Sequence, residues 1–169
     1  MAALAELGKT RAAGRIRLNS LESMARPKSY RELVVWQKAM VLAQHVYVAS
    51  DNLPKREAYG LASQIRRCAV SIASNIAEGY GRLTDTQFRH FLGTARGSLY
   101  EMQTQIELAA NLGYFDKETE TRLMEHGSEV ARLINGLLAS LRRSAIASAP
   151  VSSTANSASF ASTAKVHVP

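Results

Sequence analysis

Residues 61–82 read LASQIRRCAVSIASNIAEGYGR and combine a regular apolar pattern with a polar one. The apolar side chains recur every three or four residues, the period that places them on one face of an α-helix. They are Leu61, Ile65, Cys68, Ile72 and Ile76. The pattern predicts a helix from about Lys55 to Glu78. We expect Gly79 and Gly81 to close it, because glycine readily adopts the left-handed conformation of a helix C-cap.

A polar stripe, called the polar row below, runs beside the apolar one at the same three- and four-residue steps. On this helix it consists of Gln64, Arg67, Ser71, Asn75 and Glu78. If the chain turns back near Gly81, the residue numbers of two positions that face each other across the hairpin add up to about 162. The next helix then adds Ser98 and Glu101 to the row, near the other end of the same hairpin. The row thus has seven candidate members on two helices.

Three interpretations of the polar row are open. Half-buried polar side chains must be hydrogen-bonded, and such a row can fix the register of packed helices, within one protomer or between protomers. This structural role is favoured. A ligand or nucleic-acid site comes second. Catalysis comes last, because the row offers a carboxylate, amides and hydroxyls but no nucleophile with an adjacent base.

The segments on either side of this helix also carry the helical period. The first spans about Tyr30 to Ser50 and ends at DNLP, which predicts a turn. The third begins at Thr84, which forms a capping box with Gln87, and ends at 111–113. Asp116 is a suitable N-cap for the fourth.

Each of these segments has an apolar stripe of its own. The stripes are Leu33, Trp36, Met40, Ala43 and Tyr47; then Phe88, Leu92, Ala95, Leu99, Met102, Ile106 and Ala109; then Leu123, Val130, Ile134, Leu137 and Leu141. Four amphipathic helices joined by short turns can bury their stripes only against one another, and short turns make neighbours antiparallel. The sequence therefore predicts an all-α, up-and-down four-helix bundle over residues 30–142.

The regions outside the bundle differ from it in composition. Of the formal charge of +7, residues 1–29 carry +4, residues 30–142 carry +1 and residues 143–169 carry +2. Residues 1–29 are expected to form a flexible basic arm; alternatively, translation begins at Met24 and the preceding stretch is not part of the protein. The Ala/Ser/Thr-rich residues 143–169 lack any apolar period and are expected to be disordered.

Several classes of protein are disfavoured by composition. The single cysteine, Cys68, cannot form an internal disulfide, and the four histidines are scattered along the chain. No apolar run approaches the roughly 20 residues that a membrane-spanning helix needs, and no secretory signal is evident. We expect a cytoplasmic protein that has no metal, no cofactor and no enzymatic activity.

Four arginines give a candidate nucleic-acid site. By the same pairing sum, Arg66 and Arg67 lie level with Arg96, and Arg89 precedes Arg96 by one heptad. Such a patch would contact phosphates and carry little sequence information. The alternative is an ordinary solvated face whose arginines pair with nearby carboxylates.

The residues resemble a bacterial four-helix bundle family first met as open reading frames within 23S rRNA intervening sequences. SQIRRCAVSIASNIAEGYGR (63–82) follows the family pattern S-Q-x-R-R-A-x-x-S-I-x-x-N-I-A-E-G-x-x-R, and RGSLYEMQTQIELA (96–109) follows a later block. YRELVVWQKAM (30–40) and Leu53-Pro54 add to the match. Cys68 stands where the family pattern has alanine, so a small core residue is expected there.

The resemblance implies ring-like homopentamers of four-helix protomers without enzymatic activity. It also implies partners, because similar accessory proteins of diversity-generating retroelements bind a reverse transcriptase and nucleic acid. The expected function is that of a non-catalytic, oligomeric accessory protein that binds RNA or DNA, or a reverse transcriptase. The alternative is an oligomeric protein-binding scaffold without affinity for nucleic acid.

Overall fold

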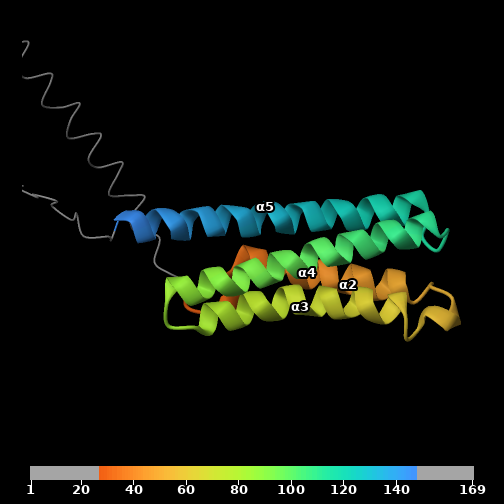
Figure 1. The fold of residues 1–169 in the computed structure, drawn as a ribbon, viewed down its shortest axis with the longest axis horizontal. Helices are drawn as coiled ribbons and strands as arrows, with labels where there is room; N and C mark the ends of the chain where they lie inside the picture. Colours follow the sequence, from red (N-terminus) through yellow and green to blue (C-terminus); the bar gives the residue numbers. More distant parts are fainter. Residues whose placement is uncertain (1–26, 148–169) are drawn as a thin grey trace, which may run out of the picture.

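The computed structural model describes residues 27–147, and helices are the only regular secondary structure over that range. A short 3-10 helix, η1 (Tyr30–Glu32), leads into α2 (Val34–Ser50), and a second one, η2 (Lys55–Glu57), leads into α3 (Leu61–Gly81). Two longer helices follow, α4 (Asp85–Asn111) and α5 (Lys117–Ala147). The four α-helices run up and down side by side (Figure 1). The predicted all-α four-helix bundle is confirmed.

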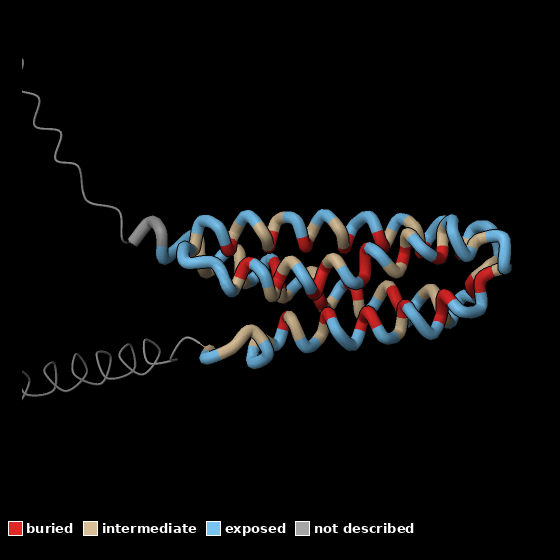
Figure 2. The backbone as a smooth tube through the Cα atoms, turned by 90° about the horizontal axis from the view of Figure 1, so that it is seen from below, coloured by how far each residue is buried: buried red, intermediate tan, exposed pale blue. Residues whose placement is uncertain are grey.

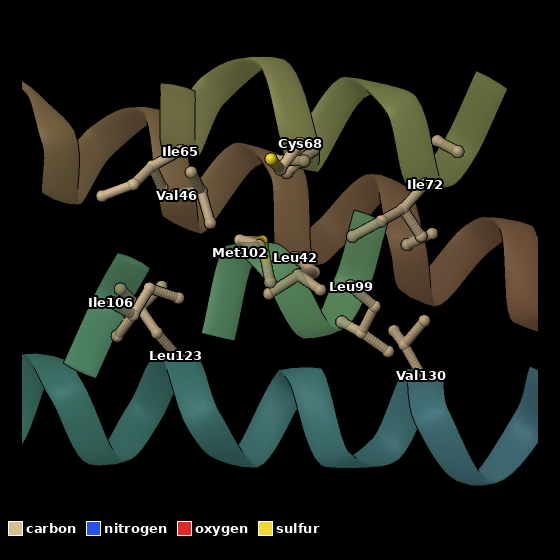
Figure 3. Close-up of a cluster of buried hydrophobic side chains, with 14 of the residues drawn as sticks. Leu42, Val46, Ile65, Cys68, Ile72, Leu99, Met102, Ile106, Leu123 and Val130 are labelled. Carbon is tan, nitrogen blue, oxygen red and sulfur yellow. The ribbon is translucent and has the colours of Figure 1, made fainter. Parts of the chain in front are cut away.

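The helices form a closed square in cross-section, because each packs against its sequence neighbours and α5 also packs against α2. The buried positions face inward along all four helices (Figure 2). In the middle of the core, side chains from every helix meet (Figure 3). They include Leu42 from α2, Ile72 from α3, Leu99 from α4 and Val130 from α5. This apolar contact is the main force that holds the bundle together.

The stripe predicted for α4 is confirmed, since all seven of its side chains are buried. The stripe predicted for α2 is wrong in part, because Met40 and Tyr47 are exposed. The residues that α2 buries are Val35, Ala39, Leu42, Ala43, Val46, Ala49 and Ser50. Since α2 has apolar residues around its whole circumference, its sequence period could not indicate which face turns inward.

Two of the predicted helix starts are confirmed. The Gln87 backbone amide donates to the Thr84 hydroxyl at 3.2 Å, and the Thr119 amide donates to the Asp116 carboxylate at 2.8 Å. The bond from Thr119 lowers the pKa of the Asp116 carboxyl. These side chains satisfy backbone N–H groups that have no partner within the helix.

The predicted end of α3 is wrong. Gly79 and Gly81 are both part of the helix, and among residues 27–147 only Gly113 has a positive φ, at 73°. Gly79 serves a close approach instead, because a Cβ built there would lie 2.6 Å from the Phe91 Cβ atom. The helix therefore continues past Glu78, and α4 packs tightly against its last turn.

This longer helix also shifts the register of the α3–α4 hairpin. Ser71 faces Ser98, so facing positions sum to 169 rather than about 162. The difference of seven residues is one heptad, which preserves the apolar faces while changing every facing pair. Arg66 and Arg67 therefore lie level with residues near Met102, one heptad beyond Arg96.

The ends of the described region bear on the predicted boundaries. Helix α5 continues to Ala147, five residues beyond the boundary expected at Arg142. The remaining expectations for the basic arm, for Met24 and for the Ala/Ser/Thr-rich tail concern residues outside 27–147 and stay predictions. Within the described residues, no helix is long and apolar enough to cross a membrane.

Candidate nucleic-acid interface

The centre of the polar row is a hydrogen-bonded link between α3 and α4. The Ser71 and Ser98 hydroxyls lie 2.9 Å apart, and the Asn75 amide donates to the Ser71 carbonyl at 2.8 Å and to its hydroxyl at 3.0 Å. All three side chains are half-buried. This part of the row lies within one protomer, and its donors and acceptors are used to join the two helices.

The other members of the row do not join this link. Glu78 pairs with Arg82, which follows the last residue of the same helix, and Glu101 accepts a hydrogen bond from the Gln105 amide at 3.3 Å. Gln64 is half-buried and Arg67 is exposed. The row therefore does not converge on a point where a substrate could be held.

Cys68 lies on α3 one turn before Ser71, close to Glu101 of α4, and is buried in the core. Burial, and then the nearby Glu101 carboxylate, raise the pKa of its thiol to about 11. A thiol with that pKa is almost wholly protonated at neutral pH, and the thiolate is the reactive form. Cys68 therefore acts as a small apolar core residue.

The four candidate arginines lie on different sides of the bundle. Arg66 points toward α2, where it donates to the Ser50 hydroxyl and the Asp51 carboxylate, each at 2.6 Å. Arg96 points toward α5 and donates to the Asn135 side chain at 3.1 Å. Arg67 and Arg89 make no ion pair within residues 27–147. The four do not form one patch, because the true register separates the pair on α3 from the pair on α4.

The structure shows instead that charge is divided along the length of the bundle. The Ser71–Ser98 hydrogen bond marks a level that separates the half with both ends of the described chain from the half with the α2–α3 and α4–α5 connections (Figure 1). The Arg66–Ser50 and Arg96–Asn135 hydrogen bonds carry this level to about residue 45 of α2 and residue 133 of α5. The first half therefore comprises residues 27–44, 71–98 and 133–147, with eight Lys/Arg and three Asp/Glu, a net charge of +5. The second half comprises residues 45–70 and 99–132. It has seven Lys/Arg and nine Asp/Glu, a net charge of −2.

We call the positive half the basic end. Its cationic residues come from α2, α4 and α5 and from the segments beside the helices: Lys28, Arg31, Lys38, Arg82, Arg89, Arg96, Arg142 and Arg143. Arg89, Arg142 and Arg143 make no ion pair with any residue of 27–147, so their charges are available to a ligand. A cationic surface of this kind attracts phosphates.

Sequence reasoning did not single out Arg142 and Arg143, because the net charge of residues 30–142 is close to zero and Arg143 was assigned to the tail that follows. The charge asymmetry would have been found by adding the charges of the helix halves that lie at the same end of the bundle, which alternate between N-terminal and C-terminal halves along the chain. That count needs the up-and-down topology and the helix ends, which the sequence predicts only approximately.

No cluster of side chains suited to a metal ion is seen in the described part of the chain. Within residues 27–147, no group of three or more His, Cys, Asp and Glu side chains is placed to hold a metal ion. The one histidine pair there is formed by His45 of α2 and His126 of α5, whose rings stack with centroids 4.5 Å apart. Lys38 and Glu129 form an ion pair of 2.9 Å between the same two helices.

This histidine pair predicts that the α2–α5 contact weakens in acid. Partial burial, and then the charges of His126 and Arg122, lower the pKa of His45 below its ordinary value of 6.5. The folded state therefore favours neutral His45, and its stability is present above that value and lost as the pH falls through the lowered pKa. Thermal melts at decreasing pH should show a smaller loss of stability for His45→Gln than for the wild type. Equal losses would show that the pair does not contribute.

Comparison with known proteins places the fold. The family described as 23S rRNA-intervening sequence protein matches residues 31–136. A crystal structure of a protein of unknown function from the S23 ribosomal protein family of Bacteroides thetaiotaomicron VPI-5482 has a similar fold, with a TM-score of 0.59. The two chains are 22% identical over 62% of this chain and 98% of the other, so the likeness concerns the fold alone. No curated protein matches the sequence.

Proposed function

Because the chain belongs to the 23S rRNA-intervening sequence protein family, we propose that it is a non-catalytic, oligomeric accessory protein that binds nucleic acid through its basic end. The observation that carries the proposal is the separation of charge along the bundle, +5 in one half and −2 in the other. The family alone does not carry it, since the solved relative is described as a protein of unknown function.

Binding through the basic end would be to the phosphate backbone. Arg89 is on the first turns of α4 and Arg142 and Arg143 are near the end of α5, so these cations reach the same end of the bundle from different helices. Contacts of this kind fix the position of a nucleic acid without reading its bases. The expected binding is therefore strong at low salt, poor in sequence preference, and weakened steeply as salt is added.

The proposal includes assembly, because a single protomer offers few phosphate contacts. The resemblance to pentameric accessory proteins supports a ring-like homopentamer in the cytoplasm, with a reverse transcriptase as a second class of partner. Linked copies would combine weak contacts into higher affinity, since each further contact becomes intramolecular once the first has formed.

The test neutralises the basic end in the full-length protein. Changing Arg89, Arg142 and Arg143 to Gln removes three positive charges, and none of these side chains is buried in the core. We expect the affinity for a labelled RNA, measured by fluorescence anisotropy, to fall. For each phosphate that the variant no longer neutralises, the log–log salt slope should become shallower by about 0.9 units on a duplex and about 0.7 units on a single strand.

A matched control removes three positive charges from the opposite end. Its variant carries Lys55→Gln, Lys117→Gln and Arg122→Gln, all at exposed positions. This control should leave the salt slope unchanged. Equal decreases in affinity for the two variants would mean that only net charge matters, and would contradict a site at the basic end.

The alternative function, an oligomeric protein-binding scaffold without nucleic-acid affinity, is favoured by a different observation. Exposed apolar side chains on α2, among them Val41 and Val48, form a surface suited to protein contacts. If the wild-type protein fails to bind RNA and DNA at low salt but assembles normally, the scaffold replaces the accessory role.

A further inference from the structure

Helix α2 carries apolar residues on every side, yet a single protomer covers only some of them. Of its 17 residues, five are polar or charged: Gln37, Lys38, Gln44, His45 and Ser50. The apolar side chains left exposed are Val34, Met40, Val41, Tyr47 and Val48, and Val48 retains 70% of its accessible surface. A helix with apolar residues on every side is normally buried on every side. The outer face of α2 is therefore left uncovered within one protomer, and a partner from outside the protomer would be needed to bury it.

The uncovered surface continues into a groove between α2 and α3. Met40, Ala43, Gln44 and Tyr47 line it from α2, and Val70, Ala73 and Ser74 line it from α3, around a volume of about 310 Å³. At one end the Arg66 guanidinium lies 5.3 Å from the centre of the Tyr47 ring. A mostly apolar groove between two helices suits the apolar side chains of a third helix.

The same chain carries a second exposed apolar face on α4, the helix diagonally across the square from α2. Tyr100 and Leu108 are each about half exposed there. Gly93 and Gly97 lie on the same outward side of the helix, and a Cβ added at either would meet nothing within 4 Å. Glycine inside a helix costs about 1 kcal/mol relative to alanine. Contacts within the protomer do not account for these two glycines, whereas a backbone approaching from outside would.

The charges beside the two faces are complementary. On α3, Arg67 is exposed, makes no ion pair within residues 27–147 and lies one turn from Val70, beside the groove. On α4, the exposed Glu101 and Glu107 flank the apolar face. A basic rim on the groove and an acidic rim on the α4 face would attract each other across a contact between two copies.

We propose that the groove between α2 and α3 receives the outer face of α4 from a second copy of this chain. The groove is formed by α2 and α3 and the apolar face by α4, so the two surfaces share no residue and each copy can use both at once in a head-to-tail contact. Contacts of this type build rings when the rotation from one copy to the next closes the circle. The inference rests on the oligomeric part of the proposed function and identifies the surfaces that would build the oligomer.

Two variants of the full-length chain test the contact. The groove variant carries Met40→Glu and Val70→Glu, and the face variant carries Tyr100→Glu and Leu108→Glu; all four positions are exposed, so the fold of the protomer is expected to survive. Each variant alone should sediment as a monomer under conditions where the wild type is assembled. Circular dichroism checks that both remain helical, and Ser128→Glu, at an exposed position on α5, is the matched control that should assemble normally.

Mixing the two variants gives the decisive result. The groove variant keeps an intact α4 face and the face variant keeps an intact groove, so a head-to-tail contact predicts one productive interface and a species of twice the protomer mass. No new species on mixing, or normal assembly of either variant alone, would overturn the proposal while leaving wild-type assembly in place. A monomeric wild type would overturn the oligomeric part of the proposed function as well.

Discussion

Replacing Leu99 by alanine is expected to lower the free energy of unfolding of the bundle by about 2–5 kcal/mol. Leu99 is fully buried where all four α-helices meet, beside Leu42, Ile72 and Val130 (Figure 3). The substitution removes apolar contact and leaves a cavity that rigid neighbouring helices fill only in part. Urea unfolding followed by circular dichroism measures the change as a lower midpoint.

The matched control is Leu83→Ala in the turn between α3 and α4, where the leucine side chain is almost fully exposed. The same chemical change should there alter the free energy of unfolding by no more than about 0.5 kcal/mol. Similar decreases for Leu83→Ala and Leu99→Ala would contradict the placement of α4 in the core.

A second large effect is expected for Gly79→Ala, which should destabilise the bundle although alanine is the better helix former. Alanine would gain about 1 kcal/mol from helix propensity. However, its Cβ would lie 2.6 Å from the Phe91 Cβ atom and 3.0 Å from the Phe88 ring, so α3 and α4 would have to move apart. Overpacking of this kind costs about 1–3 kcal/mol, and a larger cost is expected here because the nearest atom is a Cβ close to the backbone.

Gly136→Ala provides the opposite result in the same assay. Gly136 lies inside α5, and a Cβ added there would meet nothing within 4 Å. This substitution should stabilise the bundle by about 0.5–1 kcal/mol. If Gly79→Ala also stabilises it, α3 and α4 do not pack as closely as the structure shows.

The two proposed surfaces share no residue, although most of the groove lies in the positive half of the bundle. The groove of α2 and α3 runs along the side of the bundle, whereas Arg89, Arg142 and Arg143 lie nearer its end, at the start of α4 and the end of α5. A protomer could therefore join a ring and keep its basic end open to a nucleic acid. In a ring, several basic ends would act together, which links assembly to affinity.

Much of the fold was predictable because local patterns agreed with each other. In α4, the steps from Phe88 to Ala109 alternate between four and three residues, and every one of those residues is buried. The capping residues Thr84 and Asp116 were equally clear, because each satisfies backbone groups within three residues of itself. Such signals depend on neighbours in the sequence, so the sequence alone determines them.

The sequence by itself thus determined that this chain forms four antiparallel helices, which residues of α4 face the core, and where α4 and α5 begin. Only the tertiary structure decided the face that α2 buries, the one-heptad shift that sets Ser71 against Ser98, and the grouping of Arg89 with Arg142 and Arg143. The physical reason is that helix periodicity is local, whereas register and charge placement depend on how distant segments pack. A shift of one heptad leaves the apolar faces aligned, so only side-chain fit, such as the close contact of Gly79 with Phe91, selects one register over the next.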